Sequence, residues 1–124
     1  MNQRERSEFI EDILAAIIEI EGFVAGVSFE EFSDNREKTL AIVKLLEIIG
    51  EATKNIPDEL RYQYPHISWK SVTGMRNVLV HEYWQVDEAV VWSTVMESLP
   101  LLKTVMIEMI QDPAVLDRWD GSDR

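Results

Sequence analysis

The sequence lacks several of the residues that commonly carry chemistry. None of its 124 residues is a cysteine, which excludes disulfides, zinc–thiolate sites and cysteine nucleophiles. Histidine is also scarce, with two in the whole chain. One of them, His66, follows Pro65 at an expected turn, so we expect no metal site.

Long apolar runs are missing from the sequence pattern as well. We find no stretch that approaches the roughly 20 apolar residues needed to span a bilayer. The first residues mix acidic and basic side chains and lead into an amphipathic pattern, unlike a signal peptide. We therefore expect a soluble, cytoplasmic protein that does not enter a membrane.

Positive charge is in short supply. The chain has 12 basic and 23 acidic residues, for a formal net charge of −11. Proteins that bind nucleic acids generally rely on a basic surface to contact phosphates. The composition therefore counts against generic nucleic-acid binding, and any contact with RNA has to be confined to a small basic spot or assisted by another protein.

What the chain does have is enough apolar residues for one folded domain, at 46% of the sequence. A capping pattern at Asn2-x-x-Glu5, followed by helical spacing of apolar residues from Phe9 to Val24, predicts a first helix of about six turns, which Gly26 ends. Ser28-x-x-Glu31 is the capping box of a short helix. A second long helix opens near Asn35, with an inner stripe made of Leu40, Val43, Leu46, Ile49 and Ala52.

The second half of the chain continues in helices. Pro57 is expected to start a short helix at 58–64, and a further turn is expected at 68–72. A motif helix then runs through Gly74 to about Tyr83. Asp87 is a natural N-cap for the last helix, which Pro100 should kink. Its inner side is expected to hold Val90, Val91, Val95, Leu99, Leu102, Val105, Met106 and Met109.

The predicted fold class is all-α, without strands. Four main helices and several short ones form an up-and-down bundle over residues 1–110. Residues 111–124 form a polar, loosely held tail. Met96, Met106 and Met109 are expected to fill the core.

The stretch Met75-Arg76-Asn77-Val78-Leu79-Val80-His81-Glu82-Tyr83 brings four chemically useful side chains together. Arg76 keeps its charge and can grip two phosphate oxygens at once. His81 can exchange a proton near neutral pH, which suits a general base or acid. Asn77 can orient the histidine or the phosphate. These residue types predict a phosphate-handling site, although Arg-x4-His alone is a weak signal that also fits ordinary surface residues.

On an ideal helix, Arg76, Asn77 and His81 share the side turned away from the core. Arg76 and His81 are then about 140° apart, too far around one helix for both to grip one phosphate. A second copy of the helix, packed across a groove, would bring two arginines and two histidines together. We therefore expect a symmetric homodimer with the site at its seam.

The pattern Arg-x4-His-x-Tyr resembles the HepT-like toxins of the HEPN superfamily. Five further segments resemble family segments and occur in the family's order: Ser28–Phe32, Leu46–Ala52, Pro65–Trp69, Gly74–Asn77, and Val91-Trp92 followed by Leu99-Pro100. The resemblance runs from about Phe9 to about Ile110. It implies a HEPN-like bundle and a metal-independent ribonuclease, with Arg76, Asn77 and His81 in the catalytic roles.

The same resemblance implies a partner. HepT-like proteins are the toxins of type VII toxin–antitoxin pairs, and the antitoxin is a minimal nucleotidyltransferase of the MntA kind. That antitoxin moves AMP from ATP to the motif tyrosine, which is Tyr83 here, and silences the toxin. The toxin itself is expected to need no cofactor or metal, and ATP is used by the partner.

Two questions stay open from the residues alone. Glu47 and Glu51 lie four apart on one helix face, where they could line the groove and hold Arg76, or form a solvated acidic face. The net charge leaves a second function open beside the RNA endonuclease. In that alternative the protein is an acidic interaction module, a substrate and regulatory partner of a nucleotidyltransferase, with little nuclease activity.

Overall fold

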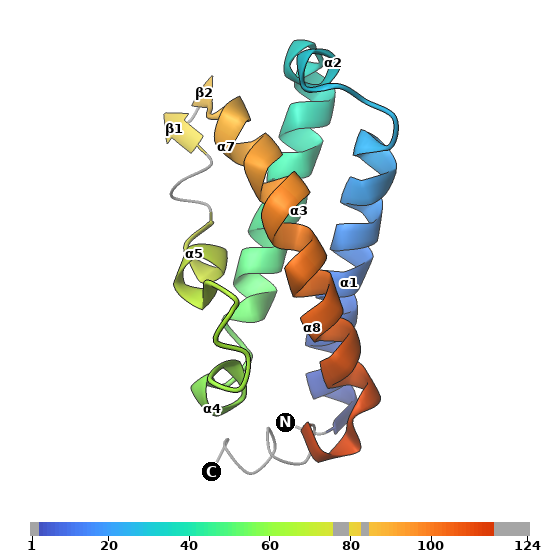
Figure 1. The fold of residues 1–124 in the computed structure, drawn as a ribbon, viewed down its shortest axis with the longest axis vertical. Helices are drawn as coiled ribbons and strands as arrows, with labels where there is room; N and C mark the ends of the chain where they lie inside the picture. Colours follow the sequence, from blue (N-terminus) through green and yellow to red (C-terminus); the bar gives the residue numbers. More distant parts are fainter. Residues whose placement is uncertain (1–2, 76–79, 83–84, 116–124) are drawn as a thin grey trace.

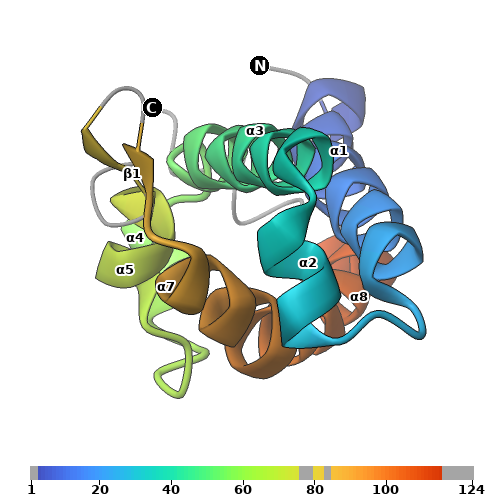
Figure 2. The ribbon, with the colours of Figure 1, turned by 90° about the horizontal axis from the view of Figure 1, so that it is seen from above.

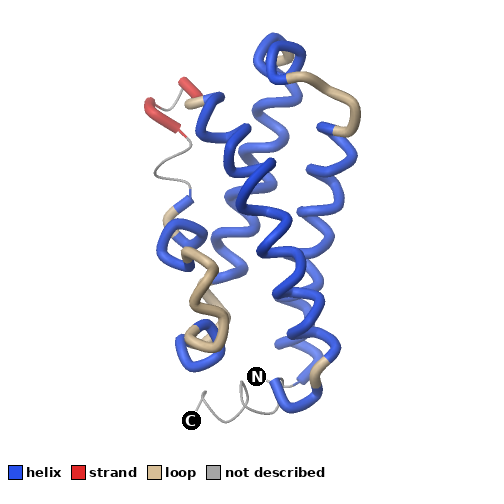
Figure 3. The backbone as a smooth tube through the Cα atoms, in the orientation of Figure 1, coloured by secondary structure: helices blue, strands red, loops and turns tan. Residues whose placement is uncertain are grey.

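Three long helical columns form the body of the protein. A computed structural model describes residues 3–75, 80–82 and 85–115, and the side chains of 7–75 and 86–115. The columns are α1 (Gln3–Val24), α3 (Arg36–Thr53) and a continuous stretch of α7 (Glu88–Ser93), η1 (Thr94–Ser98) and α8 (Leu99–Gln111). Figure 3 shows that helices make up most of the described chain. The predicted all-α bundle is therefore confirmed.

Short helices connect the columns. They are α2 (Phe29–Asp34), α4 (Asp58–Arg61) and α5 (Trp69–Thr73). In Figure 1, α1 runs upward, α3 runs downward, and the column that begins with α7 runs downward again. The chain climbs back between α3 and α7 through α4 and α5, which lie close to the two short helices expected at 58–64 and 68–72. Figure 2 shows α2 crossing one end of the bundle.

The end of α1, the start of α2 and the start of α3 lie where local chemistry predicts. Gly26, just past α1, has a φ of 72°, a left-handed conformation that glycine adopts without steric cost. Ser28 and Glu31 form the predicted capping box, in which the Glu31 amide donates to Ser28 Oγ at 3.1 Å and the Ser28 amide donates to Glu31 Oε1 at 3.2 Å. The Asn35 side chain then accepts the Lys38 amide at 3.0 Å and caps α3.

The core lies where α1 packs on α3 and α8. From α1 it takes Ile10, Ile13, Ile17 and Ile20. On α3, Val43, Leu46 and Ile49 are buried as predicted, but Leu40 is 44% exposed. Leu40 is about 120° around the helix from Leu46. Thr39, the residue before Leu40, is buried on the core side of α3. Its hydroxyl can be buried without water because it donates to the Arg36 carbonyl at 2.9 Å.

The last column contains a distortion next to the predicted proline kink. Residues Thr94–Ser98 form a π-helix, and the Leu99 amide donates to the Thr94 carbonyl five residues back. Pro100, which follows, has no amide hydrogen to extend an ordinary ladder. The core side of this stretch holds Val95 and Leu99. Met96 is 40% exposed, so the prediction that it fills the core is wrong.

The same column corrects the expectation about long apolar runs. Glu88–Gln111 is a 24-residue helical stretch, long and apolar enough by length and composition to cross a membrane. A core helix passes the same test. Here Val91, Leu102 and Met106 from this stretch are buried in the bundle core.

A small strand pair is the main departure from the predicted fold. β1 (Val80–Glu82) pairs antiparallel with β2 (Gln85–Val86), in the register Val80 with Val86 and Glu82 with Gln85. The helical pattern of the sequence predicts a motif helix that continues to about Tyr83, with no strand. The region is rich in β-branched and aromatic residues, which favour strands, and pairing of the two short segments decides between the conformations.

The C-terminal segment is held at its start. Val115, inside the predicted tail, is 1% exposed, and its amide donates to the Asp112 carbonyl at 3.0 Å. Residues 116–124 lie outside the described part of the chain. The division into a bundle over 1–110 and a loosely held tail over 111–124 stays a prediction.

Gly50 generates the first testable prediction. A Cβ added there would lie 2.9 Å from the Val72 carbonyl oxygen, a contact that forces α3 and α5 apart. We expect Gly50→Ala to lower the free energy of unfolding by about 1–3 kcal/mol, measured by urea denaturation. Gly22→Ala is the matched control, because nothing lies within 4 Å of its Cβ. There alanine should be neutral or stabilise by up to about 1 kcal/mol. Equal destabilisation by both changes would contradict this account of the α3–α5 contact.

Candidate functional site

The motif from Arg76 to Tyr83 lies only partly within the described chain. Arg76, Asn77 and Tyr83 fall outside the described residues. His81 is the middle residue of β1, so its backbone is extended and not helical. The 140° separation derived from an ideal helix therefore does not apply between Arg76 and His81, and the catalytic roles of all four residues stay predictions.

The chain enters the motif from a rigidly placed α5. The Trp69 indole Nε1–H is shared between the Arg61 carbonyl at 2.9 Å and the Tyr64 carbonyl at 3.1 Å, so Trp69 ties α5 to the end of α4. Val72 and Met75 are buried against α3, beside Gly50. The indole is a packing anchor, and the last residue before Arg76 sits in the core.

The chain leaves the motif region through a second fixed point. Asp87 caps α7, as predicted, because its carboxylate accepts the Val90 amide at 3.2 Å. One residue on, Glu88 accepts the Ser33 hydroxyl from α2 at 3.1 Å. These bonds hold the start of α7, and with it the end of β2, against α2.

Aromatic packing reinforces the same junction. The ring centroid of Trp92 lies 5.9 Å from that of Phe29 in an edge-on arrangement and 5.1 Å from that of Phe32. Contacts of this kind stabilise a core beyond the area they bury. Trp92 therefore anchors α7 on α2.

Glu47 and Glu51 line a groove between α1 and α3. The groove has a volume of about 490 Å³, and its walls also include Phe9, Asp12 and Lys44. Glu51 pairs with Lys54 at 3.0 Å, but both side chains are exposed and such pairs contribute little. The groove thus carries three carboxylates around an apolar floor, and the predicted role of Glu47 and Glu51 in holding Arg76 stays a prediction.

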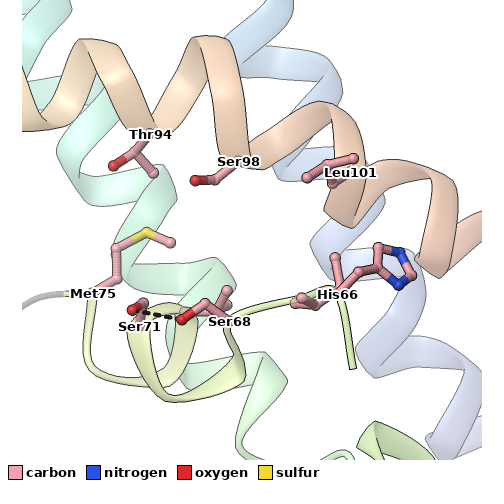
Figure 4. A pocket seen from close by; sticks show the side chains of 9 residues that line it. His66, Ser68, Ser71, Met75, Thr94, Ser98 and Leu101 are labelled. Atoms are coloured by element: carbon pink, nitrogen blue, oxygen red, sulfur yellow. Dashed lines mark hydrogen bonds between the residues drawn. The ribbon is translucent and has the colours of Figure 1, made fainter. Parts of the chain in front are cut away.

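A second hollow lies between α5 and η1. It has a volume of about 180 Å³ and is bordered by His66, which makes an edge-on ring contact with Tyr64 at 6.4 Å. Figure 4 shows hydroxyl and apolar side chains facing each other across it. Within the described residues, no three His, Asp or Glu side chains converge in a way that could hold a metal ion.

Comparison with known proteins decides the family. Residues 13–109 match the ribonuclease HepT-like family. The chain belongs to this family. The matched region contains the whole motif from Arg76 to Tyr83, and the ribonuclease class expected from the resemblance is confirmed at the level of the family.

Curated relatives of this HepT-like protein share most of its length. A protein of Thermococcus cleftensis named "Probable ribonuclease HepT" is 42% identical over 101 residues, which covers 82% of this chain and 92% of the relative. Two candidate RNases of Methanocaldococcus jannaschii are 38% and 39% identical over 112 residues, covering 90% of this chain and 97% and 93% of the relatives. No solved structure gave a significant match.

The cap at Asp87 generates the second testable prediction. Loss of a capping carboxylate costs about 1 kcal/mol, so Asp87→Ala should lower the free energy of unfolding by that amount. Because Asp87 directly follows β2, amide hydrogen exchange at Val80 and Glu82 should speed up roughly fivefold. Asp87→Asn, which preserves the cap, is the control and should exchange like the wild type. Unchanged exchange in Asp87→Ala would show that the cap does not support the strand pair.

Proposed function

We propose that this HepT-like protein is a metal-independent RNA endonuclease and the toxin of a type VII toxin–antitoxin pair. The observation that carries the proposal is the complete Arg76-x4-His81-x-Tyr83 pattern inside the region that matches the family. The matches to the relatives named as ribonucleases cover nearly the whole length of those relatives, which supports the same activity here. The reaction is proposed to occur in the cytoplasm.

The proposed chemistry is an internal transfer at an RNA phosphate. A base takes the proton from the ribose 2′-hydroxyl, whose oxygen attacks the neighbouring phosphorus. The bond from phosphorus to the 5′-oxygen breaks, and an acid returns a proton to that oxygen. The products are a 2′,3′-cyclic phosphate and a 5′-hydroxyl. His81 serves as base or acid, Arg76 stabilises the crowded phosphate, and Asn77 orients one of them.

This chemistry supports a homodimer with a composite site. The step needs both a base and an acid, yet the motif contains only one imidazole, that of His81. A second copy related by two-fold symmetry would supply the second imidazole and a second Arg76 guanidinium. The paired guanidinium groups would also concentrate positive charge locally, in a chain whose net charge is −11.

Silencing is proposed to act on Tyr83. A nucleotidyltransferase antitoxin of the MntA kind would transfer AMP from ATP to the tyrosine oxygen, releasing pyrophosphate. Tyr83 is separated by one residue from His81, so the added group places an anion and bulk beside the catalytic histidine. The AMP phosphate would compete with the RNA phosphate for Arg76.

The net charge favours a second candidate function. The net charge of −11 repels RNA at a distance. In this alternative, the protein is an acidic regulatory partner and AMP acceptor of the nucleotidyltransferase, with little nuclease activity of its own. The two functions differ in what the protein does alone: the endonuclease cleaves RNA and arrests growth without its partner, whereas the module does neither.

The third prediction tests the endonuclease. Arg76→Ala and His81→Ala should each lower the rate of RNA cleavage at least about 100-fold and abolish growth arrest, because each removes a group that acts on the reacting phosphate. Lys103→Ala is the cationic control, because it breaks only the surface pair with Glu21 and should cleave like the wild type. Sedimentation of the same samples should show dimers.

Two outcomes contradict this proposal separately. A wild type that neither cleaves RNA nor arrests growth supports the interaction module. Full activity in a preparation that sediments as a monomer at micromolar concentration would contradict the composite dimer site but not the nuclease activity.

The fourth prediction tests silencing. Tyr83→Phe keeps the ring and removes the oxygen that would accept AMP, so this variant should still arrest growth when the antitoxin and ATP are present. Tyr62→Phe is the matched control, since Tyr62 is 77% exposed and outside the motif, and it should be silenced like the wild type. Mass spectrometry should find AMP on the wild type and on Tyr62→Phe alone. Silencing of Tyr83→Phe would show that AMP transfer to Tyr83 is not the essential step.

A further inference from the structure

The hollow between α5 and η1 has two unlike kinds of wall. Its apolar side chains come from the segment before the motif and from α8, and they are Ile67, Val72, Met75 and Leu101. Its polar side chains are His66, Ser68, Ser71, Thr94 and Ser98. Figure 4 shows Thr94, Ser98 and Leu101 on one wall, facing Met75, Ser71, Ser68 and His66 on the other. The hollow is open to a ligand from solvent and has apolar surfaces and polar edges.

Two of the polar groups are free to bind a ligand. The Ser68 hydroxyl donates to Ser71 Oγ at 2.8 Å, and the Thr94 hydroxyl donates to the Val90 carbonyl at 2.7 Å, so these three already have partners. Ser98 Oγ and the His66 ring nitrogens make no hydrogen bond with any residue that the structure describes. A hydroxyl and an imidazole can each donate or accept.

Two polar side chains of η1 reach the same wall because they lie four residues apart, a spacing that puts both on one face of a helix. Thr94 and Ser98 are the first and last residues of η1, and both line the hollow. A π-helix requires a wider, poorer backbone geometry and occurs mostly as a single turn, frequently at functional sites. The distorted turn therefore coincides with the one wall that presents a free hydroxyl.

The charge of the lining separates this hollow from the other two described here. The groove between α1 and α3 is lined by Asp12, Glu47 and Glu51, and a third hollow, between α1 and the last column, is lined by Glu21. Among the described residues that line the hollow between α5 and η1, none is a carboxylate. In a chain with a net charge of −11, the hollow between α5 and η1 should therefore repel an RNA strand less than the other two hollows do.

The volume and position of the hollow further restrict which class of ligand it can bind. At about 180 Å³ the hollow is smaller than the roughly 300–1,000 Å³ of sites that enclose a whole drug-sized ligand, so it suits one planar group of a larger molecule. Met75, which lines it, is the residue directly before Arg76 in the chain. The hollow therefore lies beside the point where the chain enters the motif.

We propose that this hollow binds one unpaired base of the RNA substrate, next to the phosphate that is cleaved. The proposal rests on the endonuclease function proposed above. The apolar faces of the base pack against Ile67 and Met75, whose sulfur makes favourable contacts with aromatic rings. The edge of the base exchanges hydrogen bonds with Ser98 Oγ and His66, the mode by which proteins read single-stranded RNA. The hollow thus selects single-stranded substrate and confers a preference for one base.

The fifth prediction tests this site by NMR with nucleosides, which carry a base and no phosphate. The chain has five methionines, and the methyl group of Met75 reports directly on the hollow. Adenosine, guanosine, cytidine and uridine are titrated singly into methyl-labelled protein. At least one nucleoside should shift the Met75 methyl signal saturably at millimolar concentration, while the buried methyl groups of Met106 and Met109 stay in place.

Two variants and one control make the binding test specific. Ser98→Leu fills the hollow and should abolish the shift, and Ser98→Ala, which removes only the hydroxyl, should weaken binding severalfold. Thr104→Leu adds the same side chain on the same column outside the hollow and should bind like the wild type. If Ser98→Leu disturbs the Met106 and Met109 signals, Ser98→Ala decides. A Met75 signal that no nucleoside moves, or that moves only with protein concentration, overturns the proposal; the second result would mean that another copy fills the hollow.

Cleavage assays separate this proposal from the function on which it rests. On oligonucleotides that differ in the base beside the cleaved bond, Ser98→Leu should lower kcat/KM roughly 5- to 100-fold for the preferred base and flatten the preference. Thr104→Leu should not change it. If Ser98→Leu cleaves RNA with an unaltered base preference, the proposed base site is wrong and the proposed nuclease activity is retained. Nucleoside binding in a protein that cleaves no RNA would sink the nuclease and, with it, the assignment of the bound base to a substrate.

Discussion

The arrangement of the site depends on how closely the backbone of α5 approaches α3. Gly50 allows this approach, since a Cβ there would lie 2.9 Å from the Val72 carbonyl oxygen. With the two backbones in contact, Val72 and Met75 are buried and the wall of the adjacent hollow is placed. The point at which the chain enters the motif is therefore set by a single residue that has no side chain, some 25 positions earlier in the sequence.

The two ends of the motif region are held by different means. At the entry, a shared hydrogen bond from the Trp69 indole and burial against α3 hold α5. At the exit, the Asp87 cap and the packing of Trp92 on α2 hold α7. The chain between these points carries His81 on a strand and not on a helix. Because His81 lies on a strand, the regular spacing of one helix does not fix its position relative to Arg76. In the proposed dimer, a second copy would bring these two residue types together.

Charge limits where RNA can approach this protein. With −11 overall, long-range attraction is absent, and the α1–α3 groove adds three carboxylates to one face. In the proposed dimer, guanidinium groups at the seam and a hollow whose described lining contains no carboxylate would together offer an approach that avoids most of this repulsion. Binding of the kind proposed depends on contacts with a base and one phosphate, and so should depend less on salt than binding through many phosphates.

The sequence by itself determined the helical class, the caps and most of the core. Ser28 with Glu31 and Asp87 form caps because the bonds that define them lie within three residues, so local chemistry decides them. The family and its motif were also readable from residue order alone. Tertiary structure decided what depends on packing between distant segments. Pairing of β1 with β2 overrode the helical pattern around His81, burial of Thr39 with an internal bond displaced Leu40 from the core, and the π-turn at Thr94–Ser98 came to face α5. No local pattern distinguishes Ser98 from any other helical serine, because its exposure to a hollow exists only once two remote segments lie side by side.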